Sequence, residues 1–184
     1  MYVLDLILVG AVKRTMSLAS GMKAMIEAKN IVCARALLRM QLDTVSRVLA
    51  YTYVPDAGQM AEAVLGGQSL RKFKSCDGNA LNDAYLIRRM SVHYPWVTAV
   101  YESTSGYVHF SERQLFDSVQ SLRDSGSMTL EISAVDNKYP DFSWEEIAAC
   151  FNHLTKILAS ALKDYAEQKS AHHSSRASVP TQEI

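Results

Sequence analysis

The sequence predicts an all-α protein: a single helical bundle of five or six helices, with room for a small β-hairpin insert before the last helix. Two observations support this fold class. Apolar residues recur at spacings of three and four over long windows, which is the period of a helix that buries one face. Turn signals built from Gly, Pro, Asn and Asp separate these windows, and 184 residues suffice for one bundle core.

The first helix is expected over residues 2–28, where the apolar stripe consists of Leu4, Leu8, Ala11, Thr15, Leu18, Met22 and Met25. Residues 1–12 are strongly apolar, but Asp5 interrupts them and the basic pair Lys13-Arg14 follows them. This is the wrong charge order for a signal peptide, and the run is too short to span a membrane. We therefore expect a buried helix and no membrane association.

Asn30 is a candidate N-cap for a second helix over residues 31–54. This helix is apolar around most of its circumference, which is typical of a helix at the centre of a bundle. Pro55 should end it, because the residue before a proline is biased away from helix. Asp56 then caps a short third helix over residues 57–65, and two glycines end that helix.

A polar loop over residues 66–80 contains a basic run, Arg71-Lys72-Phe73-Lys74. Beyond it, a fourth helix is expected over residues 81–92. A fifth helix should begin near Tyr94, with Pro95 in its first turn, and run towards Tyr107.

Residues 114–122 and 128–135 show partial alternation around a turn signal, and they predict the small hairpin. Ser143-Trp-Glu-Glu146 is a capping box that should open a final helix ending near residue 169. Residues 170–184 are polar and lack periodicity, so we expect a disordered C-terminal tail after a bundle domain of residues 1–169.

Composition limits the function classes. Lys and Arg together number 19, as do Asp and Glu, so the formal net charge is +0. Such a chain lacks the basic footprint of a DNA-binding protein, and the absence of net repulsion favours a homo-oligomer. Three widely spaced cysteines without a CxxC pair indicate reduced thiols in a cytoplasmic protein. No zinc-like spacing, P-loop or GxGxxG motif is present, so we expect no metal and no cofactor.

Charged residues interrupt the apolar second helix at four-residue spacing: Arg35, Arg39, Asp43 and Arg47. They share one ridge, on which both Arg39 and Arg47 could pair with Asp43. One interpretation is a buried row of ion pairs that fixes how the helix packs. The other is an anion-binding ridge, because a guanidinium fork suits phosphate or carboxylate.

The fifth helix carries Tyr101, Ser105 and His109 at the same spacing, which places a phenol, a hydroxyl and an imidazole on one face. Because unpaired buried polar groups are costly, we expect this face and the ridge of the second helix to face each other or one shared water-filled pocket. Arg39 or Asp43 should then lie within hydrogen-bonding range of Tyr101, Ser105 or His109, directly or through water. These five residues are the candidate ligand-binding site, and His109, Ser105 and Arg39 are the candidate catalytic residues.

Four segments, Asp5–Ala11, Leu37–Asp43, Tyr94–Val97 and Val100–Ser111, resemble a family of uncharacterised bacterial helical proteins. A more distant likeness is to HEPN-type helical domains of toxins and phage-defence ribonucleases. Those domains are small, often dimeric bundles with an arginine shortly before a histidine. Here no arginine occupies the positions before His109, so Arg39 would have to take that part through space.

Two functions follow as expectations. The first is a helical module that binds a protein partner or a small anionic ligand. The alternative is a HEPN-like, metal-independent ribonuclease, in which His109 acts on RNA and Arg39 stabilises phosphate charge.

Overall fold

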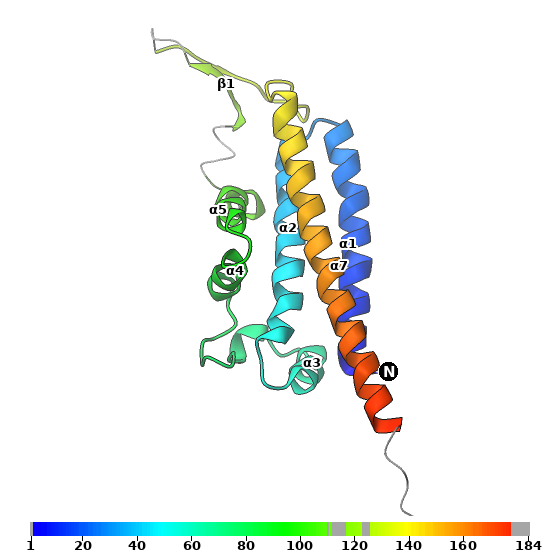
Figure 1. The fold of residues 1–184 in the computed structure, drawn as a ribbon. Helices are drawn as coiled ribbons and strands as arrows, with labels where there is room; N and C mark the ends of the chain where they lie inside the picture. Colours follow the sequence, from blue (N-terminus) through cyan, green and yellow to red (C-terminus); the bar gives the residue numbers. More distant parts are fainter. Residues whose placement is uncertain (1, 110, 112–116, 123–125, 178–184) are drawn as a thin grey trace, which may run out of the picture.

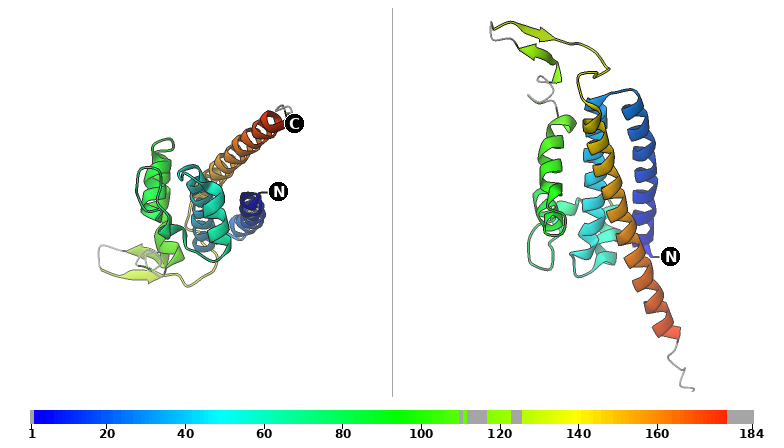
Figure 2. Two further views of the ribbon diagram at one scale, coloured as in Figure 1. Left: turned by 90° about the horizontal axis from the view of Figure 1, so that it is seen from below. Right: turned by 45° about the horizontal axis from the view of Figure 1, so that its top comes forward.

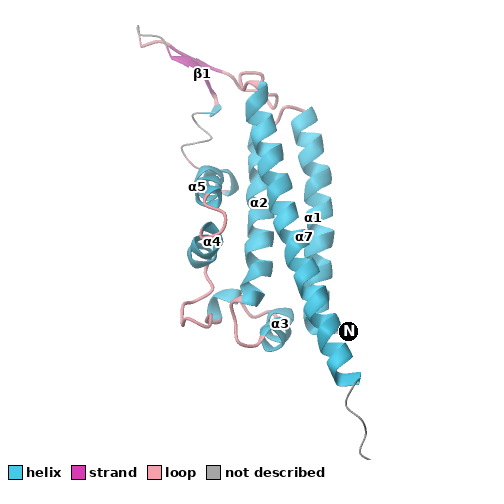
Figure 3. Ribbon diagram, viewed as in Figure 1, coloured by secondary structure: helices cyan, strands magenta, loops and turns pink. Residues whose placement is uncertain are grey.

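The computed structural model describes residues 2–109, 111, 117–122 and 126–177, and it confirms the all-α class (Figures 1 and 3). None of the helices in this described part is both long and apolar enough to cross a membrane. The elements in chain order are α1 (Val3–Glu27), α2 (Ile31–Leu49), the 3-10 helix η1 (Ala50–Thr52), α3 (Ala57–Leu65), the 3-10 helix η2 (Leu70–Lys72), α4 (Asp83–Ser91), α5 (Trp96–Val108), β1 (Val119–Leu122), β2 (Met128–Leu130) and α7 (Asp141–Ala177).

Helix α2 is the centre of the molecule. It packs against α1 and α7 on one side and against α5 on the other, and the views in Figures 1 and 2 agree on this layering. Its side chains Ile31, Leu42 and Val45 are fully buried. The predicted second helix is therefore central, although its α-helical part ends at Leu49 and continues as η1 rather than reaching residue 54.

Two of the predicted caps are present. The side chain of Asn30 accepts a hydrogen bond from the backbone N–H of Cys33 at 2.9 Å, and that of Asp56 accepts one from Gln59 at the same distance. Each satisfies a backbone donor that the first turn of a helix leaves unpaired. The short helix α3 has the predicted bounds.

The hairpin insert lies at one end of the bundle, before α7 (Figure 1). Strands β1 and β2 pair antiparallel and are shorter than the segments 114–122 and 128–135 that we predicted. Residues 112–116 and 123–125 lie outside the described residues. Asp136, in the loop that follows β2, accepts a hydrogen bond from the backbone N–H of Ile31 at 2.8 Å and so ties the insert to the start of α2.

The last helix differs from the prediction at both ends. It begins at Asp141, and the backbone N–H of Ser143 donates to the Pro140 carbonyl, so Ser143 lies inside the first turn and is not the N-cap. The helix continues to Ala177, which makes residues 170–177 helical rather than part of a disordered tail. No glycine or proline occurs between Asp141 and Pro180 to end it. Residues 178–184 lie outside the described part.

An ion-pair cluster holds α1 against α7. The carboxylate of Asp5 accepts hydrogen bonds from the Tyr165 hydroxyl at 2.8 Å and from the Lys169 ammonium at 2.6 Å. The Lys169 hydrogen bond and then that of Tyr165 stabilise the ionised carboxylate, and they lower the pKa of Asp5 to about 2.

We predict that Asp5→Asn lowers the melting temperature at neutral pH. A depressed pKa means that the carboxylate stabilises the fold above its ordinary pKa, and that this contribution disappears as the pH falls through about 2. Melts recorded from pH 7 to pH 2 should therefore show the variant and the wild type converging at the acid end. Glu167→Gln, which removes the exposed partner of Lys163, is the control and should change little. A constant difference at every pH would contradict the assignment.

Candidate functional site

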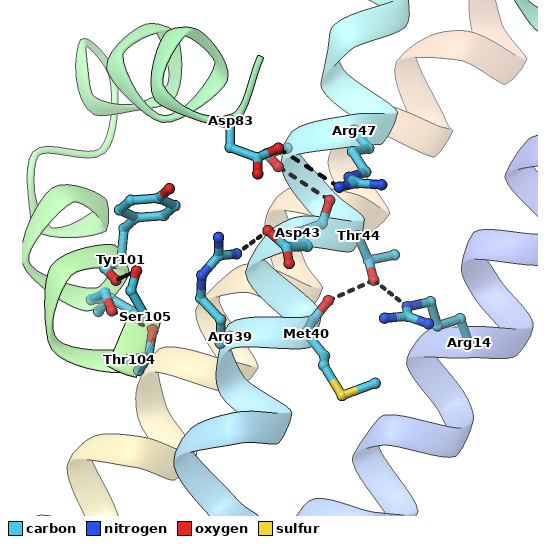
Figure 4. A network of polar contacts seen from close by, with 12 residues as sticks. Arg14, Arg39, Met40, Asp43, Thr44, Arg47, Asp83, Tyr101, Thr104 and Ser105 are labelled. Atoms are coloured by element: carbon cyan, nitrogen blue, oxygen red, sulfur yellow. Dashed lines mark hydrogen bonds and ion pairs between the residues drawn. The ribbon is translucent and has the colours of Figure 1, made fainter. Parts of the chain in front are cut away.

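Arg39 is the buried member of the α2 ridge. It is only 7% exposed, forms an ion pair with Asp43 one turn later, and lies over the ring of Tyr101 on α5, with its Cζ 4.3 Å from the ring centroid (Figure 4). The two predicted polar faces therefore meet, and they do so through the face of the Tyr101 ring, a cation–π arrangement.

Burial sets the electrostatics of Arg39. Desolvation lowers the pKa of its guanidinium below the ordinary value, and Tyr101 acts in the opposite direction. An arginine nevertheless stays protonated in proteins, so the charge is retained inside the bundle and requires its partners. The geometry favours the structural interpretation for Arg39, because both of its partners are groups of the fold itself.

Arg47 does not pair with Asp43, and this corrects the prediction. Its guanidinium lies 3.7 Å from a carboxylate oxygen of Asp83, at the start of α4 (Figure 4). Arg71, from the predicted basic run, lies 3.7 Å from the other oxygen of the same carboxylate. Asp43 is engaged by Arg39, which leaves Arg47 to a partner from another segment of the chain.

Arg35 contacts the segment between α5 and α7 that contains the hairpin insert. It donates a hydrogen bond to the Tyr107 hydroxyl, lies 3.7 Å from the Asp117 carboxylate, and sits over the ring of Tyr139 with its Cζ 5.2 Å from the centroid. Burial, and secondarily the neighbouring Asp117, raise the pKa of Tyr107 to about 12, so this phenol stays neutral. Arg35 therefore joins α2, α5 and the insert.

The candidate catalytic residues do not assemble. The Ser105 hydroxyl donates to the Tyr101 carbonyl at 2.6 Å, as a helical serine commonly does. His109 is exposed just beyond the end of α5, whereas Arg39 is buried. Within the described residues, no hydrogen bond or ion pair joins His109 to Ser105 or Arg39.

The ridge borders a cavity that we had not predicted. This cavity, called the α1–α2 cavity below, has a volume of about 440 Å³. Its charged and polar groups come from α1, α2 and η1, and apolar side chains of α1, α2, α3 and η2 complete it. The lining residues are Ile7, Gly10, Ala11, Arg14, Asp43, Thr44, Arg47, Val48, Tyr51, Val64 and Leu70.

Arg14 is the functional candidate that sequence reasoning missed. Its Nε–H donates to the Thr44 hydroxyl at 3.0 Å, and that hydroxyl donates to the Met40 carbonyl at 2.8 Å (Figure 4). Asp43, of the predicted site, also lines this cavity, whereas Arg39, Tyr101, Ser105 and His109 do not. The only available signal was a basic residue on the first helix, and nothing in the spacing pointed from Arg14 to Thr44.

Comparisons with known protein families, with curated proteins and with solved structures found no match. Among the described residues, no group of three His, Cys, Asp or Glu side chains is placed to hold a metal ion.

We predict that Asp43→Ala destabilises the fold by about 3 kcal/mol, the usual cost of leaving a buried charge without its partner. Glu27→Gln is the matched control, because it removes the carboxylate of an exposed pair with Lys23 at the same i,i+4 spacing. It should cost less than about 0.5 kcal/mol. Chemical denaturation of both variants measures the difference, and equal midpoints would show that Arg39 does not depend on Asp43.

Proposed function

We propose that this protein is a binding module for a small anionic ligand, which occupies the α1–α2 cavity. One observation carries the proposal. The guanidinium of Arg14 lines the cavity, is held at Nε by Thr44, and has no ion pair with any other described residue. A guanidinium presents a fork of donors that matches a carboxylate or phosphate, so Arg14 offers a prepared place for an anion.

Arg47 supplies a second cation to the same cavity. Its partner Asp83 lies at 3.7 Å, which is an ion-pair distance and not a hydrogen bond, so its donors can turn to a ligand. Asp43 also lines the cavity, but its charge is countered by Arg39. The net electrostatic character of the lining is therefore positive.

The hydrogen bonds around Thr44 support tight positioning. Because the Thr44 hydroxyl donates to the carbonyl of Met40 on its own helix, its lone pair is directed at Arg14. Fixing a flexible arginine before the ligand arrives reduces the entropy lost on binding. Among the residues that the structure describes, the lining contains no His, Cys, Ser or Lys, and its one carboxylate, that of Asp43, is engaged by Arg39. This composition favours binding over covalent or acid–base catalysis.

We predict that the protein binds inorganic phosphate or a simple carboxylate at one site, and that Arg14→Gln and Arg47→Gln each weaken binding by about tenfold or more. Each substitution removes a charge-assisted hydrogen bond worth about 1.5–3 kcal/mol. Isothermal titration calorimetry measures the effect. Lys23→Gln, on α1 but outside the cavity lining, is the matched control and should bind as wild type does.

A further variant tests whether filling the α1–α2 cavity prevents binding while the protein stays folded. A Cβ added at Gly10 would meet nothing within 4 Å, and Gly10 lines the cavity. Gly10→Leu should therefore place its side chain in the cavity and abolish binding without lowering the melting temperature, since glycine is a poor residue inside a helix. Wild-type affinity in this variant, or none in the parent protein, would contradict the proposal.

Self-association is a separate proposal that rests on another surface. On the face of α1 turned away from α2, Leu6, Val9 and Met16 are 47%, 66% and 66% exposed. Exposed apolar side chains gathered on one face of a surface helix favour an interaction site there, and the zero net charge imposes no repulsion between two copies.

We predict that the wild-type protein sediments as a dimer at high protein concentration, and that Val9→Lys shifts it to monomer with an unchanged circular dichroism spectrum. A charged side chain at the centre of this apolar face would have to be desolvated on association. Monomeric wild-type protein at every concentration tested would reject the proposal.

A further inference from the structure

A second cavity adjoins the α1–α2 cavity. It has a volume of about 540 Å³ and lies among α1, α2, η1, α3 and α7. Val48 and Tyr51 belong to the walls of both cavities, so the two spaces are separated by these side chains. Much of the second lining is apolar, with Leu4, Leu8, Leu49, Ala57 and Ala161.

Tyr51, which lines both cavities, has an unusual hydroxyl group. Its side chain is 6% exposed, and its hydroxyl is buried without a hydrogen-bond partner among the described residues. Buried hydroxyls are normally paired, because an unpaired one loses its hydration without compensation. No hydrogen bond to a described group holds the Tyr51 ring in place. A rotation of this ring would therefore break no hydrogen bond of the hydroxyl.

The charges of the two cavities differ. Arg14 and Arg47 are at the first cavity, whereas Asp164 on α7 lines the second. A ligand that spans both would thus meet two cations in the first cavity, and apolar walls together with the carboxylate of Asp164 in the second. This polarity selects a molecule with a single anionic head group and an uncharged tail.

We propose that the paired cavities bind a straight-chain aliphatic monocarboxylate. The carboxylate pairs with Arg14 and Arg47, and the alkyl chain passes Tyr51 into the second cavity. This inference rests on the proposed anion site and adds the chemical class of its ligand. An unbranched chain is narrow enough to pass between the side chains that separate the two cavities. Each methylene that the apolar lining removes from water adds to the binding free energy.

The test is a calorimetric titration of the intact protein with acetate, hexanoate and decanoate, kept below the concentrations at which they form micelles. Affinity should rise by up to about fourfold for each added methylene, continue to rise from hexanoate to decanoate, and keep a stoichiometry of one. The dicarboxylate with the chain length of decanoate should bind at least about tenfold more weakly than decanoate, because its second charge would enter the largely apolar cavity that Asp164 lines.

Ala161→Phe supplies the matched variant, since it fills the second cavity and leaves the first unchanged. Decanoate should then bind no more tightly than hexanoate, whose affinity stays at the wild-type value. If the phenylalanine lowers the melting temperature, Ala57→Met makes the same test from α3. Unchanged decanoate binding in a folded variant would overturn the inference.

The outcomes separate the two proposals. If phosphate and acetate bind as tightly as decanoate, the anion site stands and the aliphatic ligand is wrong. If affinity stops rising at hexanoate, the chain does not pass Tyr51, and the inference is likewise overturned. If no anion binds, the anion site itself fails and the inference fails with it. Binding of decanol as tight as that of decanoate would show that the head group does not reach the arginines.

Discussion

The burial of one guanidinium constrains much of this structure. Arg39 lies in the most buried helix, where a charge without partners would be very costly. Asp43 supplies the counter-charge from the next turn of the same helix, and Tyr101 covers the guanidinium from α5. The packing of α5 against α2 therefore helps to bury the charge of Arg39. Because Asp43 is paired with Arg39, the next arginine of the ridge, Arg47, pairs with Asp83 instead.

The three arginines of the ridge consequently have three different roles. Arg39 is enclosed, and its side chain is 8% exposed. Arg35, at 26%, joins the insert to the bundle through Tyr107, Tyr139 and Asp117. Arg47, at 53%, faces the α1–α2 cavity and is loosely paired with Asp83. Because their exposures differ, three residues of the same chemical type on one helix become a buried structural group, a link to the insert and a candidate ligand contact.

Local features of the fold could be predicted from the sequence, because their causes lie within a few residues. Asn30 and Asp56 cap the helices that follow them, and Arg39 pairs with Asp43 at helical spacing. The start of α7 was predicted too late. Ser143 and Glu146 fit a capping box, but the helix begins at Asp141, directly after Pro140. The last helix runs to Ala177, beyond its predicted end near residue 169, because low apolar periodicity does not by itself end a helix that lacks glycine and proline.

The candidate site depends on contacts between distant segments, and these could not be predicted from spacing. Thr44 meets Arg14 across two helices, and Arg47 meets Asp83 from another part of the chain. The Arg39–Tyr101 contact was expected because two polar faces in apolar surroundings had to meet. Arg14 was missed because a basic residue on a helix is usually solvated, and only the packing of α1 on α2 places it beside a cavity.

In the proposed function, Arg14 and Arg47 bind the anion, whereas Arg39 stabilises the fold. Nuclear magnetic resonance of the arginine Nε–H groups tests these roles directly, with signals assigned by single Arg→Lys variants at mildly acidic pH. During titration with hexanoate, the signals of Arg14 and Arg47 should shift and saturate together, while that of Arg39 stays constant. A shift confined to Arg39, or none at Arg14 under conditions where hexanoate binds, would contradict this assignment of roles to the arginines.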